Sequence, residues 1–418
     1  MVNQQQKQQQ QTVQPLVLIA GGGPAGLLTS ILLDKIGVNS VVIEKAPEAD
    51  EWSSKSYTIV LGHTGKTALA EAGCLEAAVE TGIERRFVYL YDSTSGDAKA
   101  VPKQTPGLGF TRPLLVEVLE KFVIEQCPRV TLKRGAGVLH VTKKDSSLEV
   151  TLEDGTILTA TNVIGSDGKW SKVRESFPEL KSQFTMITCP SFGVHMALST
   201  VPSSFKTDGT YIIKPASPDS KFYIIAAPRP EQEQGFSVSI VCHDQTLEKY
   251  PWLAPPTEMK LGEYGKGGWQ DEYSALPGSH SAEASLCNNL KSLFKEEVPA
   301  FYNAIKDDDI FQTARVNRRI TWLKVSTEKG SYSTIDGKVT LIGDSAHAMT
   351  PSMGEGCNTA LQSAVSLVDH IKTIMEEKEE QECSVNTISQ AFRKYGSSRP
   401  AEVTGIQEAS TARNMAPR

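Results

Sequence analysis

Two short apolar runs enclose a helical pattern near the start of the chain. Residues 16–20 and 40–43 are rich in β-forming side chains, and residues 27–33 carry the apolar spacing of a helix that Gly37 ends. Continuous apolar runs joined through a helix are typical of buried parallel strands. This part of the chain therefore predicts a strand, a crossover helix and a second parallel strand.

The pattern changes near Phe184, where apolar and polar positions begin to alternate. Turns rich in Pro, Gly, Asp and Ser separate four such segments, over residues 192–197, 211–213, 222–225 and 236–241. No helical pattern lies between these segments, so we expect an antiparallel sheet. Residues 286–305 then predict one or two amphipathic helices interrupted at Pro299, and a longer helix follows Asn358.

Glycines follow the first predicted strand at once. Gly21, Gly23 and Gly26 have GxGxxG spacing, and Glu44 lies at the end of the second strand, eighteen residues beyond Gly26. In such a motif the glycines permit a tight turn, close approach of the backbone to a pyrophosphate, and packing of the helix on the strand, while the acidic residue binds ribose hydroxyls. The strands and helix around these glycines predict dinucleotide binding.

Two later apolar strands also end in polar turns. Residues 165–168 read Gly-Ser-Asp-Gly, and residues 343–358 form a long turn rich in glycine and small side chains. Asp344, at a strand end, suits a polyol hydroxyl. The part over residues 351–358 brings free backbone N–H groups to a helix N-terminus, which predicts a seat for a delocalised anion such as a reduced flavin.

Composition and charge narrow the compartment and the partners. A formal net charge of −6 argues against nucleic acid as the main partner. The seven cysteines are dispersed without a CxxC pair, which favours a reducing compartment over a disulfide framework or a metal site. No stretch approaches the ~18 apolar residues of a membrane span, and residues 1–12 form a polar, glutamine-rich leader. We expect a soluble, cytoplasmic monomer or homodimer without a metal.

The three motifs at residues 21–26, 165–168 and 343–358 together resemble those of the class A FAD-dependent monooxygenases, the aromatic hydroxylases of the para-hydroxybenzoate hydroxylase type. Their order and spacing match the family over roughly residues 15–415. Residues 56–69 look like the corresponding region of kynurenine 3-monooxygenase-like members. Three co-linear motifs are far more specific than any one of them.

The resemblance implies an α/β fold in which a Rossmann-like FAD-binding domain carries an inserted antiparallel β-sheet substrate domain and C-terminal helices. The insertion would divide the FAD-binding domain into two parts. In order, we expect a disordered leader over 1–12, the first part of the FAD-binding domain over 13–183, the substrate domain over 184–310, the second part over 311–380, and a C-terminal helix over 381–418.

The resemblance also implies which residues hold FAD. Glu44 would bind the adenosine ribose, Asp344 would hold the ribityl chain, and the backbone of Cys357 and Asn358 would face the pyrimidine edge. Asp167 would touch both FAD and the incoming nicotinamide cofactor. The full set of expected cofactor contacts is Gly21, Gly23, Pro24, Ala25, Gly26, Glu44, Lys45, Arg112, Val138, Asp167, Gly343, Asp344, Pro351, Gly354, Gly356, Cys357 and Asn358.

Several motif residues also have a structural interpretation. Arg112 taken alone is either a surface charge or a phosphate contact, and the resemblance implies a position near the flavin ribityl chain and phosphates. His347 belongs to the third motif, where we expect it to support the loop. At Cys357 we expect a small packing residue rather than a redox thiol.

The motifs themselves name no catalytic acid or base. His195, Tyr211 and Tyr223 lie on the predicted antiparallel strands and are the catalytic candidates. Each has a structural alternative, because His195 could be a partly buried strand histidine and the two tyrosines could pack in the core.

The resemblance implies a reaction as well. NAD(P)H would bind transiently and reduce FAD, O₂ would add to give a C4a-hydroperoxide, and one oxygen atom would pass to a small aromatic substrate by hydroxylation or epoxidation. The protein would contribute binding, orientation and exclusion of water. Two alternatives stay open: an FAD-dependent reductase or dehydrogenase of the geranylgeranyl reductase type, and a degenerate flavin-binding scaffold without activity.

The resemblance to kynurenine 3-monooxygenase does not extend to the residues that bind the substrate carboxylate. That enzyme holds the substrate carboxylate with an Arg and a Tyr in a hairpin region, whereas the positions that align here are Val88 and Lys103. Arg85 and Arg86 lie close by in the sequence. We therefore expect a relative that acts on a different substrate.

Overall fold

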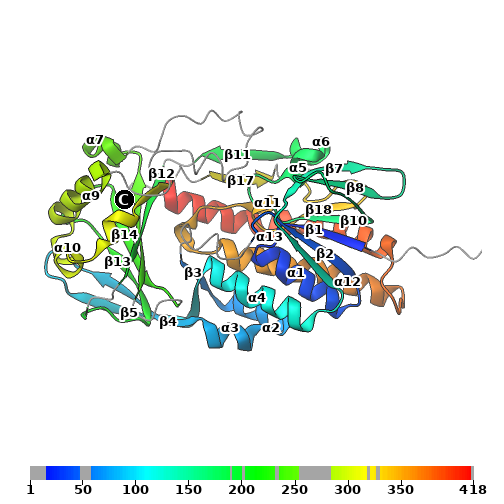
Figure 1. Cartoon of the computed structure of the whole chain (residues 1–418), viewed down its shortest axis with the longest axis horizontal. Helices are drawn as coiled ribbons and strands as arrows, with labels where there is room; N and C mark the ends of the chain where they lie inside the picture. The colour runs from blue at the N-terminus through cyan, green and yellow to red at the C-terminus, as the bar shows by residue number, and fades with distance from the viewer. Residues whose placement is uncertain are drawn as a thin grey trace, which may run out of the picture.

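The computed structural model describes residues 16–47, 58–188, 191–199, 203–230, 235–253, 284–317, 321–325 and 330–415. The leader predicted over residues 1–12 lies outside these ranges, as do residues 56 and 57 of the kynurenine 3-monooxygenase-like stretch. The described chain forms two halves, one built on a parallel sheet and the other on an antiparallel sheet (Figure 1).

A five-stranded parallel sheet forms the centre of the first half. Its strands, in spatial order, are β18 (Val339–Leu341), β10 (Asn162–Gly165), β1 (Leu16–Ala20), β2 (Asn39–Glu44) and β6 (Val130–Arg134). The apolar run at the start of the chain is the central strand, where Val17 through Ala20 are buried. Helix α1 (Pro24–Lys35) connects β1 to β2 and packs in the same core, so the predicted strand, helix and parallel strand are confirmed.

An eight-stranded sheet forms the second half. Its strands, in spatial order, are β16 (Arg315–Asn317), β12 (Ser191–Leu198), β15 (Phe236–His243), β14 (Phe222–Pro228), β13 (Gly209–Ile213), β4 (Ile83–Tyr91), β5 (Ala98–Thr111) and β3 (Thr58–Leu61). The described pairs are antiparallel except for β13 and β4, which run parallel. The alternating segments after Phe184 therefore form the predicted antiparallel sheet, and three strands from the first third of the chain extend it.

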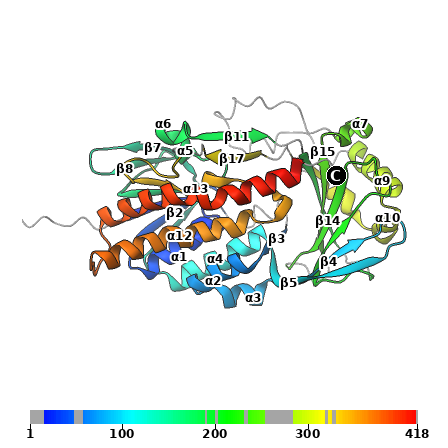
Figure 2. The same cartoon turned by 180° about the vertical axis from the view of Figure 1, so that it is seen from behind.

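One face of this sheet is covered by helices α9 (Ala284–Glu297) and α10 (Pro299–Ile305), which pack a second hydrophobic core against it. The other face looks toward the parallel-sheet half (Figures 1 and 2). We call this second face the inner face. Because side chains alternate along a strand, every second residue of β12, β13, β14 and β15 lies on it.

Shorter elements complete the fold. The strands are β7 (Val138–Lys143), β8 (Leu148–Leu152) and β9 (Ile157–Ala160), which form a three-stranded sheet, and β11 (Phe184–Thr188), which pairs with β17 (Thr321–Val325). The helices are α2 (His63–Ala72), α3 (Leu75–Thr81), α4 (Arg112–Gln126), α5 (Lys172–Ser176), α6 (Pro178–Lys181), α7 (Thr246–Lys249) and α11 (Asp344–His347). Single 3-10 turns span Pro251–Leu253, Asp309–Thr313 and Pro351–Met353. Among the described helices, none has the length and apolar character needed to cross a membrane.

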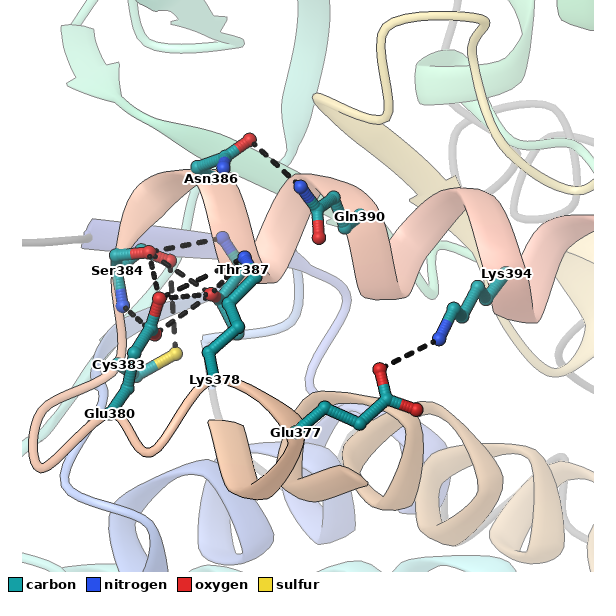
Figure 3. Close-up of polar contacts among 9 residues, drawn as sticks. All are labelled: Glu377, Lys378, Glu380, Cys383, Ser384, Asn386, Thr387, Gln390 and Lys394. Carbon is teal, nitrogen blue, oxygen red and sulfur yellow. Dashed lines mark hydrogen bonds and ion pairs between the residues drawn. The ribbon is translucent and has the colours of Figure 1, made fainter. Parts of the chain in front are cut away.

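Helices α12 (Gly356–Glu377) and α13 (Val385–Met415) lie side by side along the parallel-sheet half (Figure 2). The turn between them is fixed by the Glu380 carboxylate, which accepts hydrogen bonds from the Ser384 backbone N–H and the Thr387 hydroxyl (Figure 3). Lys394 bridges from α13 to Glu377 at the end of α12, with 3.3 Å between Nζ and Oε2. These contacts connect the two helices at one end of the pair.

Candidate active site

The turn after β1 and the first turn of α1 each need a glycine. Gly21 has a φ of +106°, and a Cβ there would lie 2.4 Å from the carbonyl oxygen of Ser166. A Cβ on Gly26 would lie 2.0 Å from the carbonyl oxygen of Gly21. Glu44, at the end of β2, accepts a hydrogen bond from the Gly22 N–H at 2.7 Å. The predicted acidic residue therefore lies directly beside the glycine turn.

Segments that are distant in the sequence meet at the N-terminal end of α1. A Cβ on Gly23 would lie 3.6 Å from an Nη atom of Arg112, the first residue of α4. A Cβ on Gly343 would lie 3.3 Å from the Cβ of Ala25 in α1 and 3.4 Å from that of Ala360 in α12. The structure thus brings together the first motif, the third motif and Arg112. Taken alone, the sequence left Arg112 open between a surface charge and a phosphate contact.

Cys357 lies in the first turn of α12, near both Arg112 and Asp344. Burial raises the pKa of its thiol to about 12; the Arg112 charge lowers this pKa and the Asp344 charge raises it. The thiol is protonated at neutral pH and is a poor nucleophile. This state supports the expectation of a packing role. Asp344 itself is exposed at the start of α11.

The donor groups at this point fit FAD. α1 begins after Gly23 and α12 begins after Glu355, and in neither helix does the side chain of the N-cap residue accept a hydrogen bond from a backbone N–H of the first turn. The hydroxyl of Thr111, next to Arg112, is buried without a hydrogen-bond partner among the described residues. Two helix N-termini, a guanidinium and an unsatisfied hydroxyl suit the phosphates and ribityl chain of FAD and the negative charge of its reduced ring.

The side chain of Asn358 connects α12 to the segment after β3. It is 2% exposed. Its Oδ1 accepts a hydrogen bond from the Gly62 N–H at 2.9 Å, and its Nδ2 donates to the carbonyls of Val60 at 3.2 Å and Gly354 at 3.3 Å. The sequence prediction concerned only the Asn358 backbone, so this role of the side chain was missed.

Asp167 joins the second motif to the third. Its Oδ2 accepts hydrogen bonds from the N–H groups of Lys172 at 2.7 Å and Val173 at 3.1 Å, and its Oδ1 accepts one from the Ser345 hydroxyl at 3.1 Å. These bonds hold α5 and α11 at fixed positions relative to β10. The predicted contacts of Asp167 with FAD and the nicotinamide cofactor stay a prediction.

A small cavity lies beside the end of β2, where we expect the adenosine. Its lining residues are Gly22, Gly23, Glu44, Arg112, Pro113, Val116 and Arg134. Arg134 lies opposite Glu44 in the parallel register of β6 and β2, and its Nε donates to Glu120 at 2.6 Å. Lys45 pairs with Glu153 at 2.8 Å, and Val138 is buried at the start of β7.

Arg134 was missed by the sequence analysis. The signal that could have found it is its place at the carboxyl end of a strand that neighbours the one ending in Glu44. In open parallel sheets ligands bind beyond these strand ends. The sequence showed the strand but not which strand it pairs with.

His347 supports the third motif from the inside. One ring nitrogen, Nε2, lies 2.8 Å from the Ser363 hydroxyl in α12, and that oxygen also accepts a hydrogen bond from Arg399 Nε at 3.1 Å. Burial lowers the pKa of His347 to about 3, and the nearby Arg399 charge lowers it too. A neutral, hydrogen-bonded imidazole supports the expected structural role.

Two of the three catalytic candidates lie on the inner face. His195 and Ser239 are opposite one another on β12 and β15, with 2.7 Å between Nδ1 and Oγ. Burial lowers the pKa of His195 to about 4, so its imidazole is neutral at physiological pH. Tyr223 alternates with Phe222 and Ile224, which face the helices, and therefore lies on the inner face.

Tyr211 lies on the opposite face, in the core beneath α9 and α10. Its ring stacks on Phe205 and Tyr89, with centroids 4.2 Å and 4.6 Å away. Its hydroxyl accepts a hydrogen bond from the Lys206 N–H at 2.7 Å. The contacts of Tyr211 favour the packing interpretation over a catalytic one.

Comparison with known proteins identifies relatives that bind FAD. The profile of the FAD binding domain family matches residues 15–261 and 291–384. FAD-dependent monooxygenase DEP2 of Alternaria brassicicola is 26% identical over 411 residues, which cover 93% of this chain and 69% of that protein. Kynurenine 3-monooxygenase of Dictyostelium discoideum is 24% identical over 402 residues, covering 94% and 77%. The solved structure of CtdE in complex with FAD superposes with a TM-score of 0.69 at 14% identity, covering 95% and 92%.

Proposed function

Since this chain belongs to the FAD binding domain family, we propose that it is an NAD(P)H-dependent flavoprotein monooxygenase that acts on a small aromatic substrate. The observation that carries the proposal is the meeting of Arg112, the α1 N-terminus and the α12 N-terminus at one point. Such a cluster of donors fits both the phosphates and the reduced ring of FAD. The named relatives include two monooxygenases that match nearly the whole chain.

We assign the parts of the cofactor as follows. The pyrophosphate would bind at the N-terminus of α1 beside Arg112, where N–H groups and a positive charge suit phosphate oxygens. Glu44 would accept hydrogen bonds from the adenosine ribose, and Asp344 would accept them from the ribityl hydroxyls. The N-terminus of α12 would hold the flavin ring, because the helix dipole there stabilises the negative charge of the reduced ring.

We assign the substrate to the inner face of the eight-stranded sheet. His195, Ser239 and Tyr223 supply hydrogen-bonding groups there, and Ile212 and Ile225 occupy the neighbouring apolar positions. Bound FAD supplies hydride acceptance from NAD(P)H and the activation of O₂ for transfer of one oxygen atom. The chain itself orients the aromatic ring, holds its polar substituent and excludes water.

We propose a substrate other than kynurenine. The resemblance implies that Val88 and Lys103 stand at the positions of the carboxylate-binding residues of that enzyme. The nearby Arg85 is fully buried, and its guanidinium donates to the carbonyl oxygens of Thr207 and Pro228. A guanidinium that already holds two backbone carbonyls is poorly placed to bind a substrate carboxylate.

The test is a screen of aromatic acids, phenols and indoles with the purified, FAD-loaded protein. A substrate should stimulate both NAD(P)H oxidation and O₂ consumption, and one atom of ¹⁸O₂ should appear in the product. Reduction of a substrate without O₂ uptake would instead identify a reductase. A folded protein that takes up no FAD would contradict the proposal altogether.

A further inference from the structure

The last turns of α13 lie against the loop that joins α11 to α12. Gln407 Nε2 donates a hydrogen bond to the carbonyl of Ala348 at 3.1 Å, and Ser410 Oγ donates one to the carbonyl of Thr350 at 2.7 Å. In return, the hydroxyls of Thr350 and Ser352 donate to the carbonyl of Ser410. We call Gln407 and Ser410, with these hydrogen bonds, the α13 brace.

The braced loop has a closed side and an open side. Thr350 and Ser410 are both fully buried where they meet. The next residues, Pro351, Met353 and Gly354, are exposed, although Met353 is large and apolar. The loop is therefore held from behind by α13, and its other side is free to contact a ligand.

The rest of α13 is fixed independently of this loop. Its first turn is held at the other end of the helix pair by Glu380 with Ser384 and Thr387, which we call the Glu380 cluster (Figure 3). In the middle, Arg399 donates from Nε to the hydroxyl of Ser363 at 3.1 Å and from an Nη atom to the carbonyl of Thr359 at 3.3 Å. α13 is thus hydrogen-bonded to α12 before it reaches the loop.

We propose that Gln407 and Ser410 are positioning residues for the flavin. They hold the backbone of residues 348–352, which sets where the N-terminus of α12 lies relative to the flavin ring. Preorganised N–H groups stabilise charge better than groups that must be ordered on binding. The inference rests on the proposed site of the flavin at α12, and it extends the cofactor site to the C-terminal helix.

The experiment uses the full-length protein prepared without FAD. Two variants remove brace hydrogen bonds, Ser410→Ala and Thr350→Val, and Thr350→Ser retains the hydroxyl. Thr404→Ala is the matched control, because the Thr404 hydroxyl lies on the same helix and donates to Pro400 at 2.7 Å. Two readouts are measured for each variant: the FAD dissociation constant by flavin fluorescence, and the midpoint potential of the bound flavin.

We expect Ser410→Ala and Thr350→Val to raise the FAD dissociation constant about tenfold and to shift the flavin potential to more negative values. The potential falls because a less ordered α12 N-terminus stabilises the reduced anion less. Thr350→Ser and Thr404→Ala should stay within about twofold of the wild type. Thr387→Ala, in the distant Glu380 cluster, should lower stability toward urea without changing the potential.

The results separate this inference from the proposed function. Wild-type affinity and potential in both Ser410→Ala and Thr350→Val would overturn the inference while leaving the FAD site intact. Wild-type protein that binds no FAD would instead overturn the proposed function. If Ser410→Ala does not fold, Gln407→Met, which removes the hydrogen bond to Ala348, takes its place with the same expected direction.

Discussion

Asn358 and Gly62, 296 positions apart in the sequence, are joined by a hydrogen bond in which the Gly62 N–H donates to Asn358 Oδ1 at 2.9 Å. The same side chain donates to the carbonyl of Val60 just before Gly62. A Cβ on Gly65 would lie 2.4 Å from this Oδ1, so the first turn of α2 closes tightly over it. One buried amide therefore fixes the start of α12, where we place the flavin, against the start of α2.

Replacement of this amide should destabilise the protein and weaken FAD binding. Asn358→Ala leaves the Gly62 N–H and the Val60 carbonyl without their partner, which costs about 1–3 kcal/mol. We expect a lower urea midpoint and a higher FAD dissociation constant. Asn386→Ala is the control, because Asn386 is exposed in the first turn of α13 (Figure 3). Equal effects of the two substitutions would refute the role of Asn358.

Glu44 should contribute to FAD affinity through both carboxylate oxygens. In the structure one oxygen accepts from Gly22 and the other from Ala46. Glu44→Gln retains a single acceptor oxygen, and the ribose hydroxyls lose a charged partner, so we expect FAD affinity to fall about tenfold, or ~1.4 kcal/mol. Fluorescence titration measures this change. Glu80→Gln, on the exposed side of α3, makes the same chemical change and should leave the affinity unaltered.

The elements of the parallel-sheet half were predictable because their signals are local. The run from Leu16 to Ala20, the glycine turn and Glu44 follow one another within thirty residues, and each has a required position relative to the others. The alternation after Phe184 likewise showed an antiparallel sheet. In both cases the order of apolar and polar residues along the segment indicates which face is buried.

The pairing of distant segments could not be predicted. The parallel pairing of β4 with β13, which sets Tyr89 opposite Tyr211, depends on contacts between residues more than a hundred positions apart. The α13 brace and the side-chain hydrogen bonds of Asn358 likewise join residues that are distant in the sequence. A serine or glutamine on a helix gives no sign in the sequence of the carbonyl it will contact.

His347 should make the fold sensitive to mild acid. Its pKa is about 3 in the folded protein and ~6.5 in an unfolded chain. Between these values the imidazole binds a proton in the unfolded chain but not in the folded protein. The contribution of neutral His347 to the free energy of unfolding is therefore complete above about pH 6.5 and is lost as the pH falls toward 3. The contribution of His347 to the slope approaches about 1.4 kcal/mol per pH unit well below pH 6.5.

Urea unfolding at pH 7.5, 6.5 and 5.5 measures this dependence. His347→Gln keeps a hydrogen-bonding group near Ser363 and removes the titration, so its stability should fall less between pH 6.5 and 5.5 than that of the wild type. His63→Gln, at an exposed position, should follow the wild-type curve. Identical pH profiles for wild type and His347→Gln would show that His347 does not titrate in this way.

Tyr223 and Tyr211 allow the same substitution to be made on the two faces of one sheet. Tyr211→Phe removes a hydroxyl that accepts a hydrogen bond from the Lys206 N–H at a part-buried position, so it should cost about 1 kcal/mol of stability and leave the KM of the folded enzyme unchanged. Tyr223→Phe removes a hydroxyl from the inner face, where we place the substrate. It should raise the KM, or increase the NAD(P)H oxidised per product formed, with a smaller loss of stability.

Steady-state kinetics and urea unfolding on both variants test the pair. A rise in KM for Tyr211→Phe with none for Tyr223→Phe would reverse the assignment, because the substrate would then have to reach the face that α9 and α10 cover.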